Sequence, residues 1–281
     1  MKKIVGIGEI LWDMLPQGKQ LGGAPANFAY HVCRLGGNGW AVSAVSDDPL
    51  GNEIKAVLAQ KNLNTCLFDV AAPTGTVAVT LDKDGVPSYE ITENVAWDMV
   101  PYTPELETLA GTAQAVCFGT LAQRSQTSRE TIHKFIAAMP EDSLKVYDIN
   151  LRQHYYSEDV IRKSLEVSDI LKINDEELET VAELFKLSGS QIEKCRSLIE
   201  EFSLKLVILT KGSKGSDVVT TDTVHSVVPD KIEVVDTVGA GDAFTAAFIV
   251  AWLRGDSIEA AHRLAGEVSS YVCTKSGAMP D

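Results

Sequence analysis

The stretch Asp236-Thr237-Val238-Gly239-Ala240-Gly241-Asp242 runs directly into the apolar residues 243–253. These are apolar on nearly every face of a helix, so we expect a buried helix over 241–253. The first N–H groups of a helix have no partner within it and carry the positive end of the helix dipole. Because Gly239, Ala240 and Gly241 have little or no side chain, their backbone N–H groups can close around an oxyanion.

Asp242 lies at the start of the expected helix, where its carboxylate shares the mouth of the site with these amides. An aspartate N-cap after a glycine turn would also explain its position. One aspartate is enough for a cap, however, and this motif adds Asp236, two glycines and a small residue between them. The stretch therefore favours an anion-binding site with a reactive carboxylate.

A second motif lies near the other end of the chain, Gly22-Gly23-Ala24-Pro25-Ala26-Asn27. Its glycines allow a ligand to approach the backbone closely, and Pro25 suits the first turn of a helix over 25–35. Asn27 offers a donor and acceptors, and Asp13 adds a carboxylate at the exit of an apolar strand. This combination suits sugar hydroxyls, although a turn that leads into a helix would also account for the motif.

The composition is that of a globular protein of 281 residues, with 45% hydrophobic and 23% charged residues. Lys plus Arg number 25 and Asp plus Glu 39, for a net charge of −14, which disfavours nucleic acid and anionic membranes as partners. The five cysteines show no CxxC spacing, and no apolar stretch is long enough to cross a bilayer. We expect a cytoplasmic protein with reduced thiols.

Strands and helices are expected to alternate along the chain. This pattern predicts a mostly parallel sheet that is covered by helices on both faces. The expected strands are residues 4–8, 40–45, 115–118, 145–149, 170–173 and 206–209. The expected helices are 25–35, 50–61, 128–139, 176–185, 191–202, 241–253 and 257–273, and a hairpin is expected over 217–220 and 224–228.

Residues 76–81 and 87–92 interrupt this rhythm, because their side chains alternate between apolar and polar across a Lys83-Asp84-Gly85 turn. This predicts a second β-hairpin, which either covers a cleft or decorates an edge. Two nucleotide-binding motifs are missing: the chain has no GxxxxGK[ST], and Gly6-Ile7-Gly8 is followed by Leu11 where a dinucleotide fingerprint needs glycine. P-loop and Rossmann chemistry are therefore disfavoured.

The two glycine motifs together resemble the signatures of the ribokinase-like (PfkB) carbohydrate kinases, most like bacterial fructokinases. The resemblance implies one three-layer α/β/α domain over residues 1–281, with a small β-sheet lid from about 10–20 and 76–98. It implies transfer of the γ-phosphoryl group of ATP to a sugar hydroxyl, with Mg²⁺. Asp242 would be the catalytic base, and the amides of Gly239, Ala240 and Gly241 the anion hole. Asp13, Gly22, Gly23 and Asn27 would bind the sugar.

The resemblance extends to three further segments. Asn174 and Glu177 match an NxxE motif that supports Mg²⁺ and phosphate largely through water, and Asn174, Thr210, Gly212 and Gly215 would meet the nucleotide. Without the resemblance, the first segment is only an acidic helix start and the second a turn. Asp236, Val238, Val272 and Gly277 resemble a loop that binds K⁺. The family usually continues with a further strand, whereas this sequence stops at Asp281.

The substrate is predicted from fewer residues. Asp148-Ile149-Asn150-Leu151-Arg152 resembles a DPNLR run of fructokinases and 2-keto-3-deoxygluconate kinases, with Ile149 in place of proline. Arg152 would reach the substrate or form a surface ion pair, and Trp97 would cover the sugar or join the core. Ala24 stands where ribokinases usually carry lysine, so the motif favours fructose.

Several alternatives stay open beside fructose. The other acceptors are ribose, 2-keto-3-deoxygluconate and nucleosides, and a non-catalytic sugar or nucleotide sensor on the same fold would need a damaged Asp242 or anion hole. Pairing of two lids could form a homodimer.

Overall fold

The computed structural model describes residues 3–15, 18–81 and 87–281. Among these residues, nine strands form one sheet in the order β13-β12-β11-β10-β9-β8-β1-β4-β5. Neighbours from β5 to β11 run parallel, and β12 and β13 are antiparallel additions at one edge. The strands are β1 (Lys3–Ile7), β4 (Asn38–Val45), β5 (Asn64–Asp69), β8 (Ala113–Phe118), β9 (Leu144–Asp148), β10 (Ile170–Asn174), β11 (Leu206–Thr210), β12 (Ser216–Val219) and β13 (Val224–Val227).

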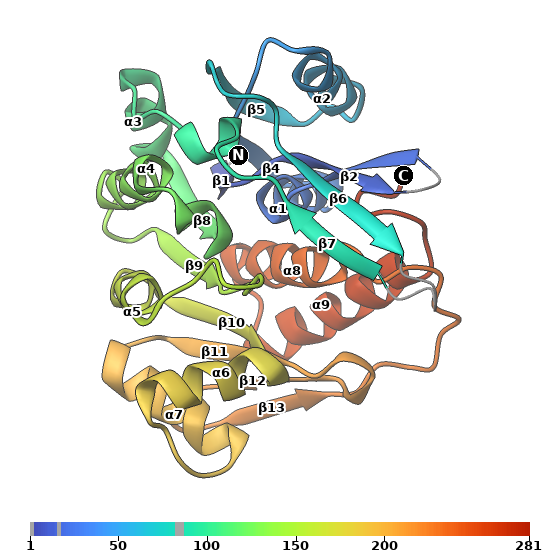
Figure 1. The fold of residues 1–281 in the computed structure, drawn as a ribbon. Helices are drawn as coiled ribbons and strands as arrows, with labels where there is room; N and C mark the ends of the chain where they lie inside the picture. Colours follow the sequence, from blue (N-terminus) through green and yellow to red (C-terminus); the bar gives the residue numbers. More distant parts are fainter. Residues whose placement is uncertain (1–2, 16–17, 82–86) are drawn as a thin grey trace.

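Helices cover both faces of this sheet, so the predicted three-layer α/β/α fold is confirmed (Figure 1). One face carries α1 (Ala24–Arg34), α2 (Pro49–Gln60), α8 (Ala240–Arg254) and α9 (Ile258–Cys273). The other carries α3 (Pro104–Ala110), α4 (Gln126–Ala137), α5 (Glu158–Glu166), α6 (Asp175–Phe185) and α7 (Gln191–Phe202). None of the described helices is long and apolar enough to cross a membrane.

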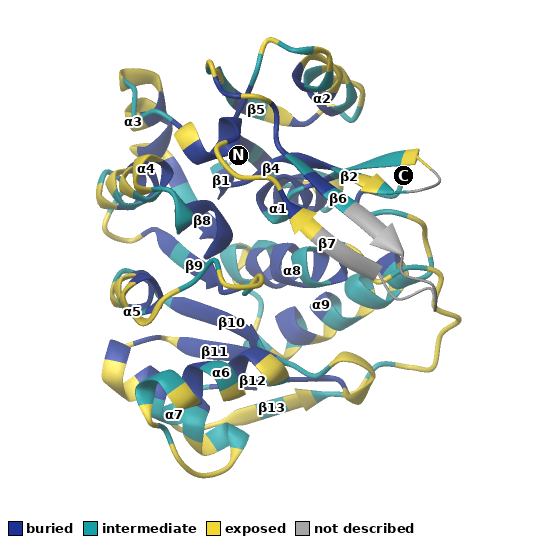
Figure 2. Ribbon diagram, in the orientation of Figure 1, coloured by how far each residue is buried: buried dark blue, intermediate teal, exposed yellow. Residues whose placement is uncertain are grey.

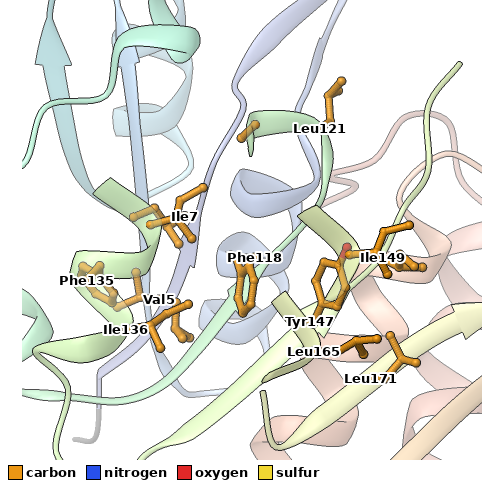
Figure 3. Packing of buried hydrophobic residues seen from close by; sticks show 14 of the residues in the cluster. Val5, Ile7, Phe118, Leu121, Phe135, Ile136, Tyr147, Ile149, Leu165 and Leu171 are labelled. Atoms are coloured by element: carbon orange, nitrogen blue, oxygen red, sulfur yellow. The ribbon is translucent and has the colours of Figure 1, made fainter. Parts of the chain in front are cut away.

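The core on the α3–α7 face is built from strand residues that alternate with those of the opposite face. Figure 3 shows Phe118 stacked beside Tyr147, with ring centroids 5.2 Å apart and Leu165 close by. On the opposite face α8 packs against α1 and α9, and its side chains from Ala243 to Ile249 are buried (Figure 2). The predicted buried helix is therefore confirmed, and it begins one residue earlier than expected, at Ala240.

A second, smaller sheet lies beside the large one (Figure 1). In the described part of the chain it has four strands in the order β3-β2-β6-β7. They are β3 (Gly18–Gly22), β2 (Leu11–Leu15), β6 (Thr76–Leu81) and β7 (Pro87–Ile91). The antiparallel pairing of β6 with β7 confirms the predicted hairpin, and β2 joins β6 in parallel. The expected Lys83-Asp84-Gly85 turn lies outside the described residues.

Candidate functional site

The two glycine motifs meet where α1 and α8 begin. Asn27 in the first turn of α1 donates from Nδ2 to Oδ2 of Asp242 in the first turn of α8, over 2.8 Å. The oxygen of the Asn27 amide, Oδ1, is buried and has no hydrogen-bond partner among the described residues. The two motifs therefore form one polar site at the shared end of two packed helices.

The glycines of both motifs occupy positions where a side chain would clash. Gly23 caps α1 with φ of 117°, and a Cβ there would lie 2.5 Å from the carbonyl oxygen of Glu9. Gly239 caps α8 in the left-handed conformation, with φ of 76°, and its Cβ would lie 2.7 Å from the Cα of Ala278. The chain can therefore close around both helix starts only because these residues are glycine.

The start of α8 presents backbone N–H groups to the site. No side chain caps this helix, so its first-turn amides are left to other acceptors. Ala240 uses its own N–H in a long bond of 3.3 Å to the carbonyl of Thr237. The Lys172 ammonium group lies against Gly241, one residue further into the first turn: a Cβ on Gly241 would be 3.1 Å from Nζ. The helix start therefore has one positive side chain, Lys172, beside its amides.

A buried ion pair lies behind this helix start. Lys172 Nζ is 3.0 Å from Asp148 Oδ1, and Thr245 donates to the other carboxylate oxygen over 3.1 Å. The parallel register of β9 and β10 places Lys172 opposite Asp148. Burial alone would lower the pKa of Lys172, but the carboxylates of Asp148, Glu177 and Asp242 outweigh it and raise that pKa. The lysine is therefore a fixed positive charge under the site.

Two carboxyl groups of the site bind protons unusually tightly. The pKa of Asp242 is raised to about 7, mainly by desolvation and then by the charge of Asp148, while the hydrogen bond from Asn27 opposes the rise. The pKa of Glu9 is also raised to about 7, again mainly by burial. Such shifted carboxyl groups in a cleft mark a candidate catalytic site.

The residues predicted to bind sugar lie around the same carboxylate, with one exception. Asp13 on β2 faces Gly22 on β3, where a Cβ would be 2.5 Å from its Oδ2. Burial raises the pKa of Asp13, and the exposed Arg152 opposes that rise. The Arg152 charge also lowers the pKa of Asp242. The charge of Arg152 therefore acts on both Asp242 and Asp13, which lies against Gly22.

The prediction that Trp97 covers the sugar is wrong. Trp97 lies in the 3₁₀ turn η1 (Ala96–Met99), and its exposed fraction is 0%. Its ring packs into the large core and against the guanidinium group of Arg124, 3.9 Å from the ring centroid. The apolar residues Val95, Ala96 and Val100 around it draw the turn into the core, so the ring has no surface to offer a ligand.

A pocket of about 570 Å³ opens on the other side of the α8 start. Its wall includes Thr210, Gly212 and Gly215 from the turn after β11, together with Ala240 and Gly241. The rest of the lining includes apolar residues such as Val227, Ile232 and Phe244, together with serines and the charged pair Asp230 and Lys231. Three predicted nucleotide-binding residues thus line a pocket large enough for a cofactor-sized ligand, which ends at the predicted anion hole.

Asn174 and Glu177 form a reciprocal cap on α6. Asn174 Oδ1 accepts the N–H of Glu177, and Glu177 Oε2 accepts the N–H of Asn174. Its Oε1 accepts the N–H of Leu151. Each carboxylate oxygen keeps a lone pair for water, so the pair fits a water-bridged Mg²⁺ better than direct ligation. Within the described ranges, no three His, Cys, Asp or Glu residues are grouped to hold a metal ion.

The predicted K⁺ residues belong to two segments that Asp236 joins. Its Oδ1 accepts the N–H of Val238, and its Oδ2 accepts the N–H of Gly277. The carbonyl of Val272 accepts the N–H of Lys275. Asp236 therefore fixes the loop before α8 to the segment after α9.

Sequence reasoning did not single out Glu9, Asp148 or Lys172 as site residues. Two of them had a signal, because Lys172 is the lone charge in the strand Ile170–Asn174 and Glu9 follows an apolar strand at Gly8. A charged residue in an apolar strand is unfavourable unless it is paired or functional. The pairing of Asp148 with Lys172 could not be read, since it depends on the order of strands in the sheet.

Comparisons with known proteins agree with this geometry. Residues 16–281 match the family model described as pfkB family carbohydrate kinase. Fructokinase-2 of Zea mays is 32% identical over 99% of this chain and 90% of its own length. The structure of sugar kinase PH1459 from Pyrococcus horikoshii with ATP superposes with a TM-score of 0.81 at 28% identity, over 99% and 94% of the two chains.

A fructokinase double mutant from Vibrio cholerae, bound to fructose, ADP and potassium, superposes with a TM-score of 0.84 at 26% identity. The superposition covers 99% of this chain and 94% of that one. The family match spans nearly the whole sequence and contains the anion-hole motif, the loop from Gly22 to Asn27 and the residues that line the pocket. This chain therefore belongs to the pfkB family of carbohydrate kinases.

Proposed function

We propose that this sugar kinase transfers the γ-phosphoryl group of ATP to the terminal hydroxyl of fructose and forms fructose 6-phosphate. The observation that carries the proposal is the hydrogen bond between Asn27 and Asp242. It holds a carboxylate between the glycine loop suited to a sugar and the rim of a pocket suited to a nucleotide. The full-length relative of Zea mays named fructokinase and the fructose-bound neighbour support this choice of sugar.

The acceptor sugar would lie among Asp13, Gly22, Gly23, Asn27 and Arg152. Asn27 has a free acceptor, Oδ1, for a sugar hydroxyl while its Nδ2 holds Asp242. Backbone at the glycines allows the sugar to approach closely. The second sheet, with residues of about 10–20 and the hairpin that begins at Thr76, would form the lid over the sugar, as part of the single domain.

Asp242 would act as the base. As the sugar oxygen attacks the γ-phosphorus, the new O–P bond forms and the bond from phosphorus to the bridging oxygen of ADP breaks. The hydroxyl proton passes to Asp242. A loose transition state releases this proton late, so a carboxylate is sufficient. The amides of Gly239, Ala240 and Gly241 would stabilise the charge that develops on the transferred group.

The nucleotide would occupy the pocket lined by Thr210, Gly212 and Gly215, with Asn174 near its phosphates. Mg²⁺ neutralises phosphate charge when bound, and Asn174 and Glu177 would hold it through water. The loop and segment joined by Asp236, with the backbone of Val238, Val272 and Gly277, would be the K⁺ site. Since all five cysteines are free thiols, we place the enzyme in the reducing cytoplasm.

The test is an ADP-release assay with purified protein across fructose, ribose, 2-keto-3-deoxygluconate and nucleosides, with and without K⁺. We expect the highest kcat/KM with fructose and a rise in rate on addition of K⁺. A clear preference for another acceptor would replace fructose but keep the kinase. Sugar binding without ADP release would instead indicate a non-catalytic sensor.

A further inference from the structure

Glu9 is a buried carboxyl group that the proposed reaction does not use. It follows β1, and only 4% of its surface is exposed. Its carboxylate takes backbone hydrogen bonds from its own N–H and from that of Ala24 at the start of α1. The oxygen Oε2 is buried and has no hydrogen-bond partner in the described part of the chain.

Glu9 and Asp242 line the same small cavity. Its volume is about 10 Å³, and its other walls come from Cys117, Asp148 and residues of α1. A cavity of this size is near the lower limit for one water molecule. The two carboxyl groups are close enough that the charge of Asp242 raises the pKa of Glu9.

The charged groups around this cavity leave Glu9 without a direct cation. Asp148 from β9 is paired with Lys172 from β10, and Lys172 also faces Glu177. Arg152, from the loop after β9, acts on both Glu9 and Asp242 but is exposed. The Cys117 thiol from β8 is kept neutral, because burial raises its pKa well above the ordinary value. A proton is therefore the available means to neutralise Glu9.

We propose that Glu9 and Asp242 form a coupled carboxyl pair that shares one proton at the inner end of the site, in which Glu9 is a positioning residue whose charge sets the pH at which Asp242 ionises to accept the proton of the sugar hydroxyl. This rests on the proposed role of Asp242. The pair titrates as a unit: a proton on Glu9 favours the carboxylate of Asp242, and an ionised Glu9 favours a protonated Asp242.

Glu9 also accepts a hydrogen bond at the start of α1. If that were its only role, replacing it would not shift the pH dependence of the activity. The Glu9→Gln variant keeps the size and the acceptor oxygen for Ala24, and it mimics the protonated acid at every pH. Without the competing negative charge, Asp242 should ionise more easily. We expect the acid limb of the kcat/KM profile to move to lower pH by about one unit.

The matched control is Cys117→Ala, which enlarges the same cavity and changes no charge, so its acid limb should stay where it is in wild type. An unmoved acid limb in Glu9→Gln together with a lower Tm would overturn the proposal and leave Glu9 as a helix cap. An equal shift in Cys117→Ala would also overturn it.

A measurement on the wild-type protein covers the case in which Glu9→Gln does not fold. With ¹³C-labelled carboxyl groups, NMR should show Glu9 and Asp242 titrating in two shared steps, and independent single-step curves would contradict the coupling. The Asp242→Asn variant separates this inference from the proposed function. If that variant keeps its activity, the base assignment fails; if it is inactive and Glu9→Gln shows no shift, only the role of Glu9 fails.

Discussion

The carboxylate of Asp242 that would act as the base also lowers the stability of the fold at high pH. We expect Asp242→Asn to lower kcat at least several hundredfold with little change in KM, since a general base contributes roughly 10²–10⁴-fold. The same substitution should stabilise the fold in alkali. The folded pKa is raised to about 7, so the protein loses stability as the pH rises through that value, and asparagine avoids the loss.

Two measurements check this prediction: steady-state kinetics, and urea unfolding at pH 5 and pH 8. The gain in the free energy of unfolding at pH 8 should be about 2 kcal/mol relative to pH 5. Asp222→Asn, on the exposed hairpin turn, is the control and should change neither quantity. A kcat within tenfold of wild type would contradict the role of Asp242 as the base.

At the scale of the element, α8 is bounded by two left-handed glycines with different surroundings. Gly239 has φ of 76° and lies against Ala278, whereas Gly255 at the other end has φ of 95° and no heavy atom within 4 Å of an added Cβ. Gly255→Ala therefore measures the backbone strain alone, about 1 kcal/mol. Gly239→Ala adds a clash with a backbone that His31 holds through the carbonyl of Ala278, over 2.9 Å.

We expect Gly239→Ala to lower the free energy of unfolding by at least 2 kcal/mol and kcat by more than tenfold, because the amides of the helix start would move. Gly255→Ala should leave kcat unchanged. Equal losses in the free energy of unfolding for the two variants, measured by urea unfolding, would show that the contact with Ala278 does not contribute to stability.

The elements that the sequence predicted are those with strong apolar patterns. The buried strands β1, β4, β8, β9, β10 and β11 and the helices α1, α2, α4, α6, α7, α8 and α9 all lie where they were expected, within a few residues. The strands β3 and β5 and the helices α3 and α5 were missed. β3 is Gly-Lys-Gln-Leu-Gly, and β5 is an edge strand that includes Asn64 and Asp69, so neither carries a continuous apolar signal.

The site was predictable where short motifs carry the chemistry and not where the tertiary fold assembles it. The position of Asp242 before an apolar helix can be read directly from the sequence. The burial of Trp97 could not be read, because an aromatic ring after a hairpin suits a core as well as a ligand. The ion pair of Lys172 and Asp148 depends on the neighbouring positions of β9 and β10.

For the whole molecule, His262 and the carboxyl groups of Glu9 and Asp242 change stability in opposite directions between pH 4 and pH 7. Burial lowers the pKa of His262 to about 4, so its contribution is present above the unfolded pKa of about 6.5 and is lost as the pH falls toward 4. The pKa values of Glu9 and Asp242 are raised to about 7, so their contribution is full below their unfolded pKa values of about 4 and is lost progressively as the pH rises to 7. Because two carboxyl groups lose stability over the range in which one histidine gains it, stability should fall from pH 4.5 to about 7 and then level off.

Urea unfolding of wild type from pH 4.5 to 8.5 measures this curve. His262 contacts Ser216 over 2.7 Å and His225 over 2.8 Å, and His262→Gln should steepen the fall between pH 4.5 and 6.5, because it removes the opposing gain. Glu9→Gln should do the opposite. Parallel curves for wild type and both variants would contradict these assignments.

The hydrogen bond that joins Asn27 to Asp242 spans 215 positions of the chain. During synthesis, the glycine loop that contains Asn27 therefore leaves the ribosome long before Asp242. A nascent chain can therefore form much of its large sheet before it has the residues needed to phosphorylate a sugar with ATP. Contacts of such range also form slowly. Only molecules that have finished folding are therefore expected to be catalytically active.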